Sequence, residues 1–198
     1  MEHKESKIIS PQLLLEAYQN GFFPMADPDS GEIEWFFPFV RAIFPIYSIT
    51  PSHSMRRILK KNIFEVRINT SFEKVIMACA NRPDTWINDV IINSYINLHK
   101  LGYAHSFETF KDGKLVGGLY GVSIGAAFFG ESMFSLVSNA SKVAFYHLVE
   151  HLKAKNFVLL DSQFINEHTK MLGAIEIPRN QYLKILKYAI SRTDVSFL

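Results

Sequence analysis

The spacing of apolar and polar residues changes along the chain and predicts a mixture of helices and strands. In some segments apolar residues recur three to four positions apart, as on one face of an amphipathic helix, and in others they alternate with polar residues, as in half-buried strands. The predicted helices are 11–20, 53–62, 71–80, 88–101, about 139–153, 166–172 and a last helix from Asn180. The predicted strands are 64–69, 104–111, 114–122, 125–134 and 157–163.

Turn residues support several of these boundaries. Ser10-Pro11 is typical of a helix start, and Asn20-Gly21 is typical of a helix end. Asp112-Gly113 separates two strand-like runs, which predicts a β-hairpin. Residues 157–160 are all apolar, so the segment 157–163 is expected to be a buried strand that ends in polar residues.

The order of these elements predicts an α+β fold in two parts. Residues 22–51 contain five prolines among aromatic residues, so we expect an irregular or short-stranded segment there. We therefore expect a small N-terminal domain at 1–62, ending in a basic linker helix, and a second domain at 63–198. The second domain combines a hairpin-rich sheet, a crossover helix and a parallel strand, an order that resembles the acyltransferase (GNAT-type) layout.

Composition narrows the class of protein. With 198 residues, 48% of them hydrophobic, and 17 Phe, 8 Tyr and 2 Trp, the chain can form a large core and is not disordered. The net charge of +2 means that any binding of a polyanion depends on local clusters. The single Cys79 excludes an internal disulfide and a Cys-rich zinc module, and favours the cytoplasm. Residues 1–7 are charged and precede no secretory apolar stretch, and the Gly-rich run 115–130 is too short to span a membrane.

Two short motifs suggest hydrolytic chemistry but have weak support. Gly121-Val122-Ser123-Ile124-Gly125 matches the nucleophile elbow of serine hydrolases, with Asp161 and His168 following in order, yet the sequence after it predicts a strand where the elbow needs a helix.

His147-Leu148-Val149-Glu150-His151 matches an inverted zinc-peptidase helix, with Glu167 or Glu176 as a third ligand. The same positions also suit a solvated helix face. We therefore expect no bound metal.

Cofactor motifs are missing from the sequence. The glycines of 117–130 match neither a P-loop nor a dinucleotide fingerprint. No Gly-rich turn precedes the helix at about 139–153, where an acetyltransferase would hold the pyrophosphate of coenzyme A. We therefore expect no cofactor.

A basic cluster on the helix 53–62 is the first candidate binding feature. Arg56, Arg57, Lys60 and Lys61 form two like-charge pairs four residues apart, with no acidic residue between 52 and 64. Each such pair destabilises a helix by about 0.2–0.5 kcal/mol. An anionic partner would account for them, and so would a solvated helix face.

Three polar residues in apolar surroundings are the candidate chemical groups. Glu131 has Phe128, Met133 and Phe134 as neighbours, so its carboxylate needs a cation, either from the protein or from a substrate. Asp161 and Gln163 are two residues apart at the end of an apolar strand, so we expect both side chains on one face, at a common position for a site.

Many ordered blocks between about Ser10 and Tyr188 resemble the leucyl/phenylalanyl-tRNA–protein transferase family. The blocks are Leu14 with Glu16-Ala17-Tyr18, Gly21-Phe22-Phe23-Pro24, Trp35 with Pro38 and Arg41, His53-Ser54-Met55-Arg56-Arg57, Thr85-Trp86-Ile87, Gly102-Tyr103-Ala104-His105-Ser106 with Glu108, the runs 115–122, 130–135 and 139–142, Asp161-Ser162-Gln163, Leu172-Gly173-Ala174 and Ile177-Pro178-Arg179. Met25 and Phe36 stand where many members have Trp, and Ser162 where many have Cys.

The resemblance implies a reaction and a set of roles. Members transfer Leu or Phe from aminoacyl-tRNA to the N-terminal Arg or Lys of a protein, which marks it for degradation (the N-degron pathway), without metal, nucleotide or CoA. Glu131 would hold the α-amino group of the donor. Gln163 would accept a proton from the attacking amine, with Asp161 polarising it or relaying the proton. The pattern leaves Met open as a further donor.

The remaining roles implied by the resemblance concern binding. The donor side chain would enter an apolar pocket, Asn166 would lie near the acceptor peptide, three aromatic residues would stack on or contact the 3′ adenosine, and the basic cluster would contact the acceptor stem. The pocket residues are Leu119, Phe128, Met133, Phe145 and Leu160, and the aromatic residues are Tyr18, Trp86 and Tyr95. The alternative function is a non-catalytic RNA-binding module, and a serine hydrolase or zinc peptidase is less favoured.

Overall fold

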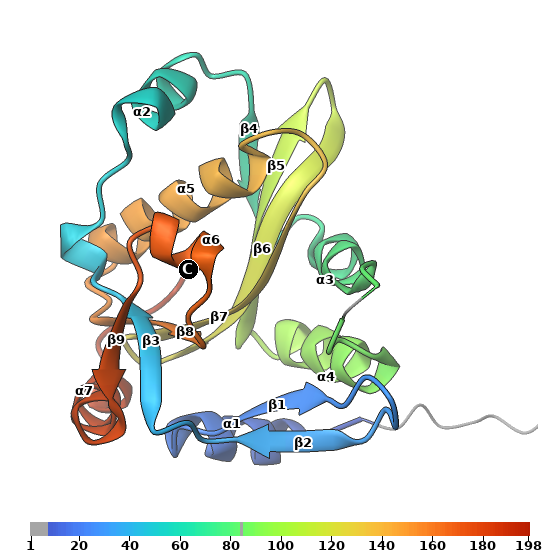
Figure 1. Cartoon of the computed structure of the whole chain (residues 1–198), viewed down its shortest axis with the longest axis vertical. Helices are drawn as coiled ribbons and strands as arrows, with labels where there is room; N and C mark the ends of the chain where they lie inside the picture. Colours follow the sequence, from blue (N-terminus) through green and yellow to red (C-terminus); the bar gives the residue numbers. More distant parts are fainter. Residues whose placement is uncertain (1–7, 84) are drawn as a thin grey trace, which may run out of the picture.

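A seven-stranded sheet forms the centre of the protein, in the order β4-β5-β6-β7-β8-β3-β9 (Figure 1). The computed structural model describes residues 8–83 and 85–198, and residues 1–7, which carry the prediction about a secretory signal, lie outside them. The strands of this sheet are β3 (Val40–Phe44), β4 (Glu65–Ile68), β5 (Ala104–Lys111), β6 (Lys114–Ile124), β7 (Ala127–Ser135), β8 (Leu159–Gln163) and β9 (Ile175–Pro178). A separate hairpin pairs β1 (Phe23–Ala26) with β2 (Ile33–Phe36).

Helices cover both faces of the sheet and create two hydrophobic cores. The helices are α1 (Pro11–Gln19), α2 (His53–Lys60), α3 (Phe72–Ala80), α4 (Asp89–Lys100), α5 (Ala140–Ala154), α6 (Glu167–Met171) and α7 (Arg179–Ser191), with a 3-10 turn η1 (Ile46–Ser48). Phe128 belongs to the core beneath α5, and its neighbour Phe129 to the core shared with α1, α3, α4 and α7, as alternation along a strand requires. Within the described ranges, no helix is long and apolar enough to cross a membrane.

The predicted α+β architecture is confirmed. β5 and β6 form the hairpin around Asp112-Gly113, and β7 continues the antiparallel pairing. α5 then crosses over to β8, which pairs with β7 in parallel. This is the hairpin, crossover helix and parallel strand of the GNAT-type layout expected from the sequence.

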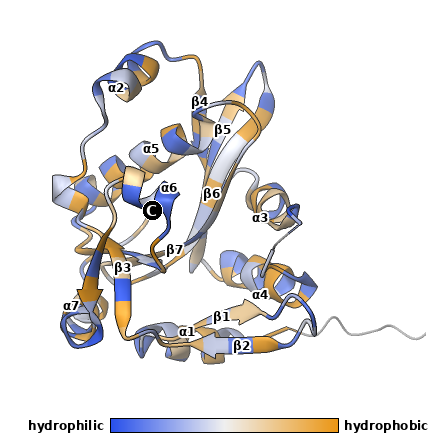
Figure 2. Cartoon of the chain, in the orientation of Figure 1, coloured by the Kyte–Doolittle hydropathy of each residue, from blue (hydrophilic) through white to orange (hydrophobic). Residues whose placement is uncertain are grey.

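One strand of the central sheet, β9, was not predicted, and another, β3, lies in the segment 22–51 that we expected to be irregular or short-stranded. β3 and β9 come from segments whose prolines and mixed polarity give no clear alternation, and both are stabilised as strands by pairing, β3 lying between β8 and β9. The segment 1–62 therefore contributes one strand to the central sheet. In Figure 2, β3 has hydrophobic colours interrupted by one hydrophilic segment, because Arg41 is its only polar residue.

Pairing irregularities at two neighbouring strands produce an opening in the sheet. β7 and β8 pair only between Ala127–Phe129 and Leu159–Asp161, and then part. Glu131 is an extra residue in β7, because its neighbours Gly130 and Ser132 pair with two consecutive residues of β6 and leave Glu131 without a partner in the register. Ser162 is likewise an extra residue in β8, opposite β3. Such β-bulges redirect side chains and are common next to active sites.

Close packing of α5 on β6 depends on a glycine. A Cβ at Gly117 would lie 2.5 Å from the Cβ of Ala140, at the start of α5, and 2.9 Å from the Oγ1 of Thr109. We expect Gly117→Ala to lower the free energy of unfolding by about 1–3 kcal/mol, because the extra methyl group overpacks this contact. Urea denaturation measures the change. Lys114→Ala, at the exposed start of the same strand, should change stability by less than about 0.5 kcal/mol, and an equal effect of both variants would contradict the close contact.

Candidate active site

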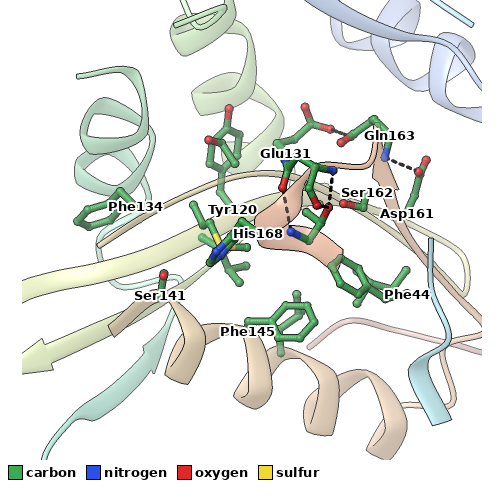
Figure 3. A pocket seen from close by; sticks show the side chains of 18 of the residues that line it. Phe44, Tyr120, Glu131, Phe134, Ser141, Phe145, Asp161, Ser162, Gln163 and His168 are labelled. Atoms are coloured by element: carbon green, nitrogen blue, oxygen red, sulfur yellow. Dashed lines mark hydrogen bonds between the residues drawn. The ribbon is translucent and has the colours of Figure 1, made fainter. Parts of the chain in front are cut away.

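A cleft of about 430 Å³ opens where β7 and β8 part (Figure 3). Its walls come from β3, β6, β7, β8, α5, α6 and the segment between α3 and α4. The cleft is lined by all three candidate chemical groups, Glu131, Asp161 and Gln163. The structure therefore brings together the residues that the sequence singled out 30 positions apart.

Glu131 projects from the bulge in β7 into a set of hydrogen-bond donors. Its Oε1 accepts bonds from the hydroxyl of Tyr18 at 2.7 Å and from Nε2 of Gln163 at 3.0 Å. Its Oε2 accepts a longer bond, 3.3 Å, from the hydroxyl of Tyr95. The hydroxyls of Tyr18 and Tyr95 also contact each other. These donors come from α1, β8 and α4, so the carboxylate joins three separate elements.

The environment of Glu131 favours its neutral form. Burial raises the pKa of this carboxyl to about 8, although the hydrogen bond from Tyr18 acts in the opposite direction. A cation bound beside the carboxylate would offset the cost of its charge. The site is therefore suited to a positively charged ligand, whose binding would be coupled to ionisation of Glu131.

Asp161 is held by a buried ion pair with Arg41 of β3. Nε of Arg41 lies 2.9 Å from Oδ1 of Asp161, and its NH2 group lies 2.6 Å from Oδ2, and both side chains are at most 1% exposed. Arg41 also donates to the carbonyl of Gly21 at 3.0 Å, and Tyr182 donates to Oδ2 of Asp161 at 2.8 Å. Burial lowers the pKa of Arg41, but the Asp161 carboxylate outweighs it and raises that pKa overall. Arg41 therefore stays charged. Both carboxylate oxygens of Asp161 already accept hydrogen bonds, so Asp161 is not available as a base for a substrate.

Gln163 links the ion pair to Glu131. Its backbone has a φ of +56°, an uncommon conformation for a residue with a side chain. Its backbone N–H donates to Oδ1 of Asp161 at 2.9 Å, while its side-chain Nε2 donates to Glu131. The contact from Asp161 thus reaches the main chain of Gln163 and not its side-chain amide, which differs from the relay suggested by the sequence.

The other side of the cleft is apolar. Leu119, Met133, Phe145 and Leu160, all predicted pocket residues, line it together with Phe44 and Leu148. His168 of α6 reaches this wall, with its Nε2 3.2 Å from Sδ of Met133 (Figure 3). An apolar pocket of this kind suits a large aliphatic or aromatic side chain.

Three predicted site residues occupy other positions. Phe128 is fully buried outside the cleft lining and stacks on Phe197, with 5.4 Å between ring centroids. Tyr18 and Tyr95 are also fully buried, so their rings offer no face for a nucleotide, in contrast to the expected stacking role. Their contribution is the pair of hydroxyls at Glu131. Trp86 remains half-buried in the cleft wall.

The other predicted binding residues lie at the edge of the cleft or away from it. Asn166 lines the cleft and caps α6, its Oδ1 accepting the N–H of Thr169 at 2.8 Å. The basic cluster lies on α2 (Figure 1) and its C-cap residue Lys61, and none of its residues lines the cleft. The buried Met55 anchors α2. The cluster residues Arg56, Arg57, Lys60 and Lys61 are all exposed.

The two hydrolase motifs do not form hydrolase sites. Ser123 lies inside β6, paired with Phe128 across to β7, and not on a strand-to-helix turn. His151 donates through Nε2 to the carbonyl of Phe197 at 2.6 Å, whereas His147 is exposed. In the described part of the chain, no three His, Cys, Asp or Glu side chains are grouped so that they could hold a metal ion.

The sequence analysis assigned no role to two residues that support the site, Arg41 and Tyr182. Arg41 could have been found, because a charged residue among Val40, Ala42 and Ile43 needs a buried partner. Tyr182 gave no such signal, since tyrosine is ordinary on an amphipathic helix. Only the fold places its hydroxyl at Asp161.

The raised pKa of Glu131 predicts a pH-dependent stability. Between about pH 4.5 and pH 8 the unfolded chain has an ionised Glu131 and the folded protein a neutral one, so folding binds a proton and stability falls as the pH rises. Relative to Glu131→Gln, the free energy of unfolding of the parent should fall by up to about 1.4 kcal/mol per pH unit in this window. Urea denaturation at several pH values measures it. Glu73→Gln, an exposed control, should keep the slope of the parent, and parallel profiles for the parent and Glu131→Gln would show that Glu131 ionises normally.

Comparison with known proteins identifies the family. The family model described as "Leucyl/phenylalanyl-tRNA protein transferase" matches residues 43–187, and the one for its N-terminal domain matches residues 8–38. A leucyl/phenylalanyl-tRNA–protein transferase from Gloeobacter violaceus is 52% identical over 183 residues, covering 92% of this chain and 95% of its own. One from Chlorobaculum tepidum is 48% identical over 195 residues, covering 96% and 100%.

Among solved structures, an acetyl transferase from Salmonella typhimurium aligns with 49% of this chain and 67% of its own, at 14% identity and a TM-score of 0.35. The sequence matches are far stronger, since they extend over nearly the whole chain at about half identity. By these matches, the chain belongs to the leucyl/phenylalanyl-tRNA protein transferase family.

Proposed function

We propose that this protein is an aminoacyltransferase that moves Leu or Phe from aminoacyl-tRNA to the N-terminal Arg or Lys of acceptor proteins in the cytoplasm. The observation that carries the proposal is the composition of the cleft. One wall presents the Glu131 carboxylate, which suits an ammonium group, and the other presents an apolar pocket. An aminoacyl ester has both a cationic α-amino group and an apolar side chain, a few bonds apart.

The reaction needs no cofactor because the donor is already an activated ester. The acceptor amine attacks the ester carbonyl carbon, the new C–N bond forms, and the bond from that carbon to the ribose oxygen breaks. The proton lost by the amine ends on the ribose oxygen. Catalysis then rests on holding the two reactants in position and on polar groups near the reacting atoms.

Gln163 is the polar group that we assign to the attacking amine. Its Nε2 donates to Glu131, which leaves its carbonyl oxygen free to accept an N–H of the amine. Asp161 supports this role indirectly, because it bonds the backbone N–H of Gln163 and is itself held by Arg41. Asp161 and Arg41 are therefore positioning residues.

Separate surfaces would bind the remainder of the tRNA and the acceptor. Trp86, in the cleft wall, is the candidate for contact with the 3′ adenosine, since stacking on aromatic rings tolerates any base. Asn166 lies at the same cleft and is the candidate near the acceptor peptide. The exposed basic cluster of α2 would contact phosphates of the acceptor stem.

Transfer of labelled Leu from Leu-tRNA to a peptide that begins with Arg tests the function directly. We expect transfer without added metal, nucleotide or CoA, and none to the same peptide with an acetylated N-terminus, because the nucleophile is then blocked. Binding of aminoacyl-tRNA without any transfer would favour the alternative of a non-catalytic RNA-binding module.

The role of Gln163 predicts a loss in the chemical step. Gln163→Ala should lower kcat about 10- to 100-fold and change KM for aminoacyl-tRNA much less, because the amide would contact the attacking amine and reaches the donor site only through Glu131. Steady-state kinetics at saturating acceptor measure both constants. Gln12→Ala, which removes an exposed amide from α1, is the matched control. A normal kcat for Gln163→Ala would exclude the assigned role.

The role of α2 predicts a change in salt dependence. Arg57→Ala combined with Lys61→Ala should raise KM for aminoacyl-tRNA. The slope of log binding constant against log salt concentration should become shallower by about one to two, because each lost phosphate contact removes about 0.7–0.9 from it. An aminoacyl-adenosine donor, which has no acceptor stem, should be used equally by variant and parent. Lys184→Ala with Lys187→Ala, two exposed cations of α7, is the control pair, and an unchanged slope for the α2 variant would assign the RNA contacts to another face.

A further inference from the structure

The hydroxyl of Tyr120 is a buried polar group that lacks a hydrogen-bond partner. Across residues 8–83 and 85–198, it is the buried side-chain polar atom for which no partner is found. Tyr120 itself has no exposed surface and contributes to the lining of the cleft (Figure 3). Buried hydroxyls are nearly always bonded in folded proteins, so an unpaired one next to a binding cleft needs an explanation.

Packing holds the Tyr120 ring next to the Glu131 site. In β6, Tyr120 pairs across to Ser132 of β7, the residue that follows Glu131 in the bulge. Its ring packs edge-on against Tyr95 and Phe72, each with 5.8 Å between ring centroids. Tyr95 in turn donates to Glu131. The Tyr120 ring therefore packs against a residue that contacts this carboxylate. Burial raises the pKa of Tyr120 well above its ordinary value, so the hydroxyl keeps its proton.

An ammonium group at Glu131 would need more acceptors than the carboxylate provides. An ammonium has three N–H donors, whereas Oε1 of Glu131 already accepts two bonds, from Tyr18 and Gln163. Oε2 accepts one long bond from Tyr95 and has room for a new donor. A second acceptor is therefore required near Glu131, and a hydroxyl oxygen without a partner is chemically suited to that role.

We propose that the Tyr120 hydroxyl oxygen accepts a hydrogen bond from the α-ammonium group of the aminoacyl donor, beside Glu131. This inference rests on the proposed function, because it takes the aminoacyl ester as the ligand of the cleft. Tyr120 then acts in donor binding and does not take part in proton transfer. Its contribution should be equal in the ground state and the transition state, so its loss affects KM and not kcat.

Two stable amides of 3′-amino-3′-deoxyadenosine test the proposal by calorimetric binding, without catalysis. One amide carries phenylalanine at the ribose 3′ position and the other carries 3-phenylpropionic acid, which lacks only the α-amino group. Tyr120→Phe should bind the phenylalanine amide about 10-fold or more weakly than the parent, because a hydrogen bond to a charged group is lost. It should bind the phenylpropionyl amide as the parent does. Tyr103→Phe, which removes an exposed hydroxyl, should change neither affinity.

Thermal unfolding of the free protein separates ligand binding from a structural role. If the hydroxyl has no partner before the donor binds, Tyr120→Phe should melt at a temperature no lower than the parent. Equal affinities of parent and Tyr120→Phe for the phenylalanine amide would overturn the proposal, as would a lower melting temperature with unchanged affinity, which would indicate a bond to buried water. Failure of the proposed function looks different: the parent itself would transfer no amino acid and bind neither amide.

Discussion

The buried ion pair between Arg41 and Asp161 is the interaction on which the rest of the site depends. It joins β3 to β8, and through the carbonyl of Gly21 and the hydroxyl of Tyr182 it also holds the end of α1 and the helix α7. The guanidinium lies 4.5 Å from the ring centroid of Phe23 and 4.6 Å from that of Tyr182. Because removing one partner of such a pair costs about 3–5 kcal/mol, these elements have one stable arrangement. The Asp161 carboxylate, held in this way, bonds the backbone of Gln163.

The cleft follows from the way this ion pair and two β-bulges act on the sheet. Parting of β7 and β8 after three paired residues exposes the ends of both strands. The bulge at Glu131 and the bulge at Ser162 then alter the alternation of side chains on the two strands that face the opening. A regular sheet would pair these residues and leave no space for a ligand. Irregular pairing therefore provides both the cavity and the chemical groups within it.

The electrostatics of the cleft suit a ligand that carries its own positive charge. Burial makes an ionised Glu131 costly, and the Arg41 guanidinium, which favours the ionised form, is already paired with Asp161. An ammonium ligand supplies the missing countercharge, so the energy of ionising Glu131 becomes part of the binding energy. The basic residues that suit RNA lie apart, on α2. In the proposed reaction, this arrangement separates recognition of the tRNA from recognition of the amino acid.

Local patterns in the sequence determined most of the elements and the three chemical groups, whereas the contacts between them were decided only by the tertiary structure. The hairpin around Asp112-Gly113 and the buried strand β8 follow from turn chemistry and periodicity over a few residues. Glu131 was recognisable because a carboxylate among apolar residues needs a partner. The donors to Glu131 were not recognisable. The hydroxyl of Tyr18 comes from 113 residues away, and the ring of Tyr18 was expected to contact a nucleotide. The same holds for Arg41 and Asp161, 120 residues apart. Periodicity reports on neighbours along the chain, but pairs at such separation form only when the packing of the whole sheet brings them together.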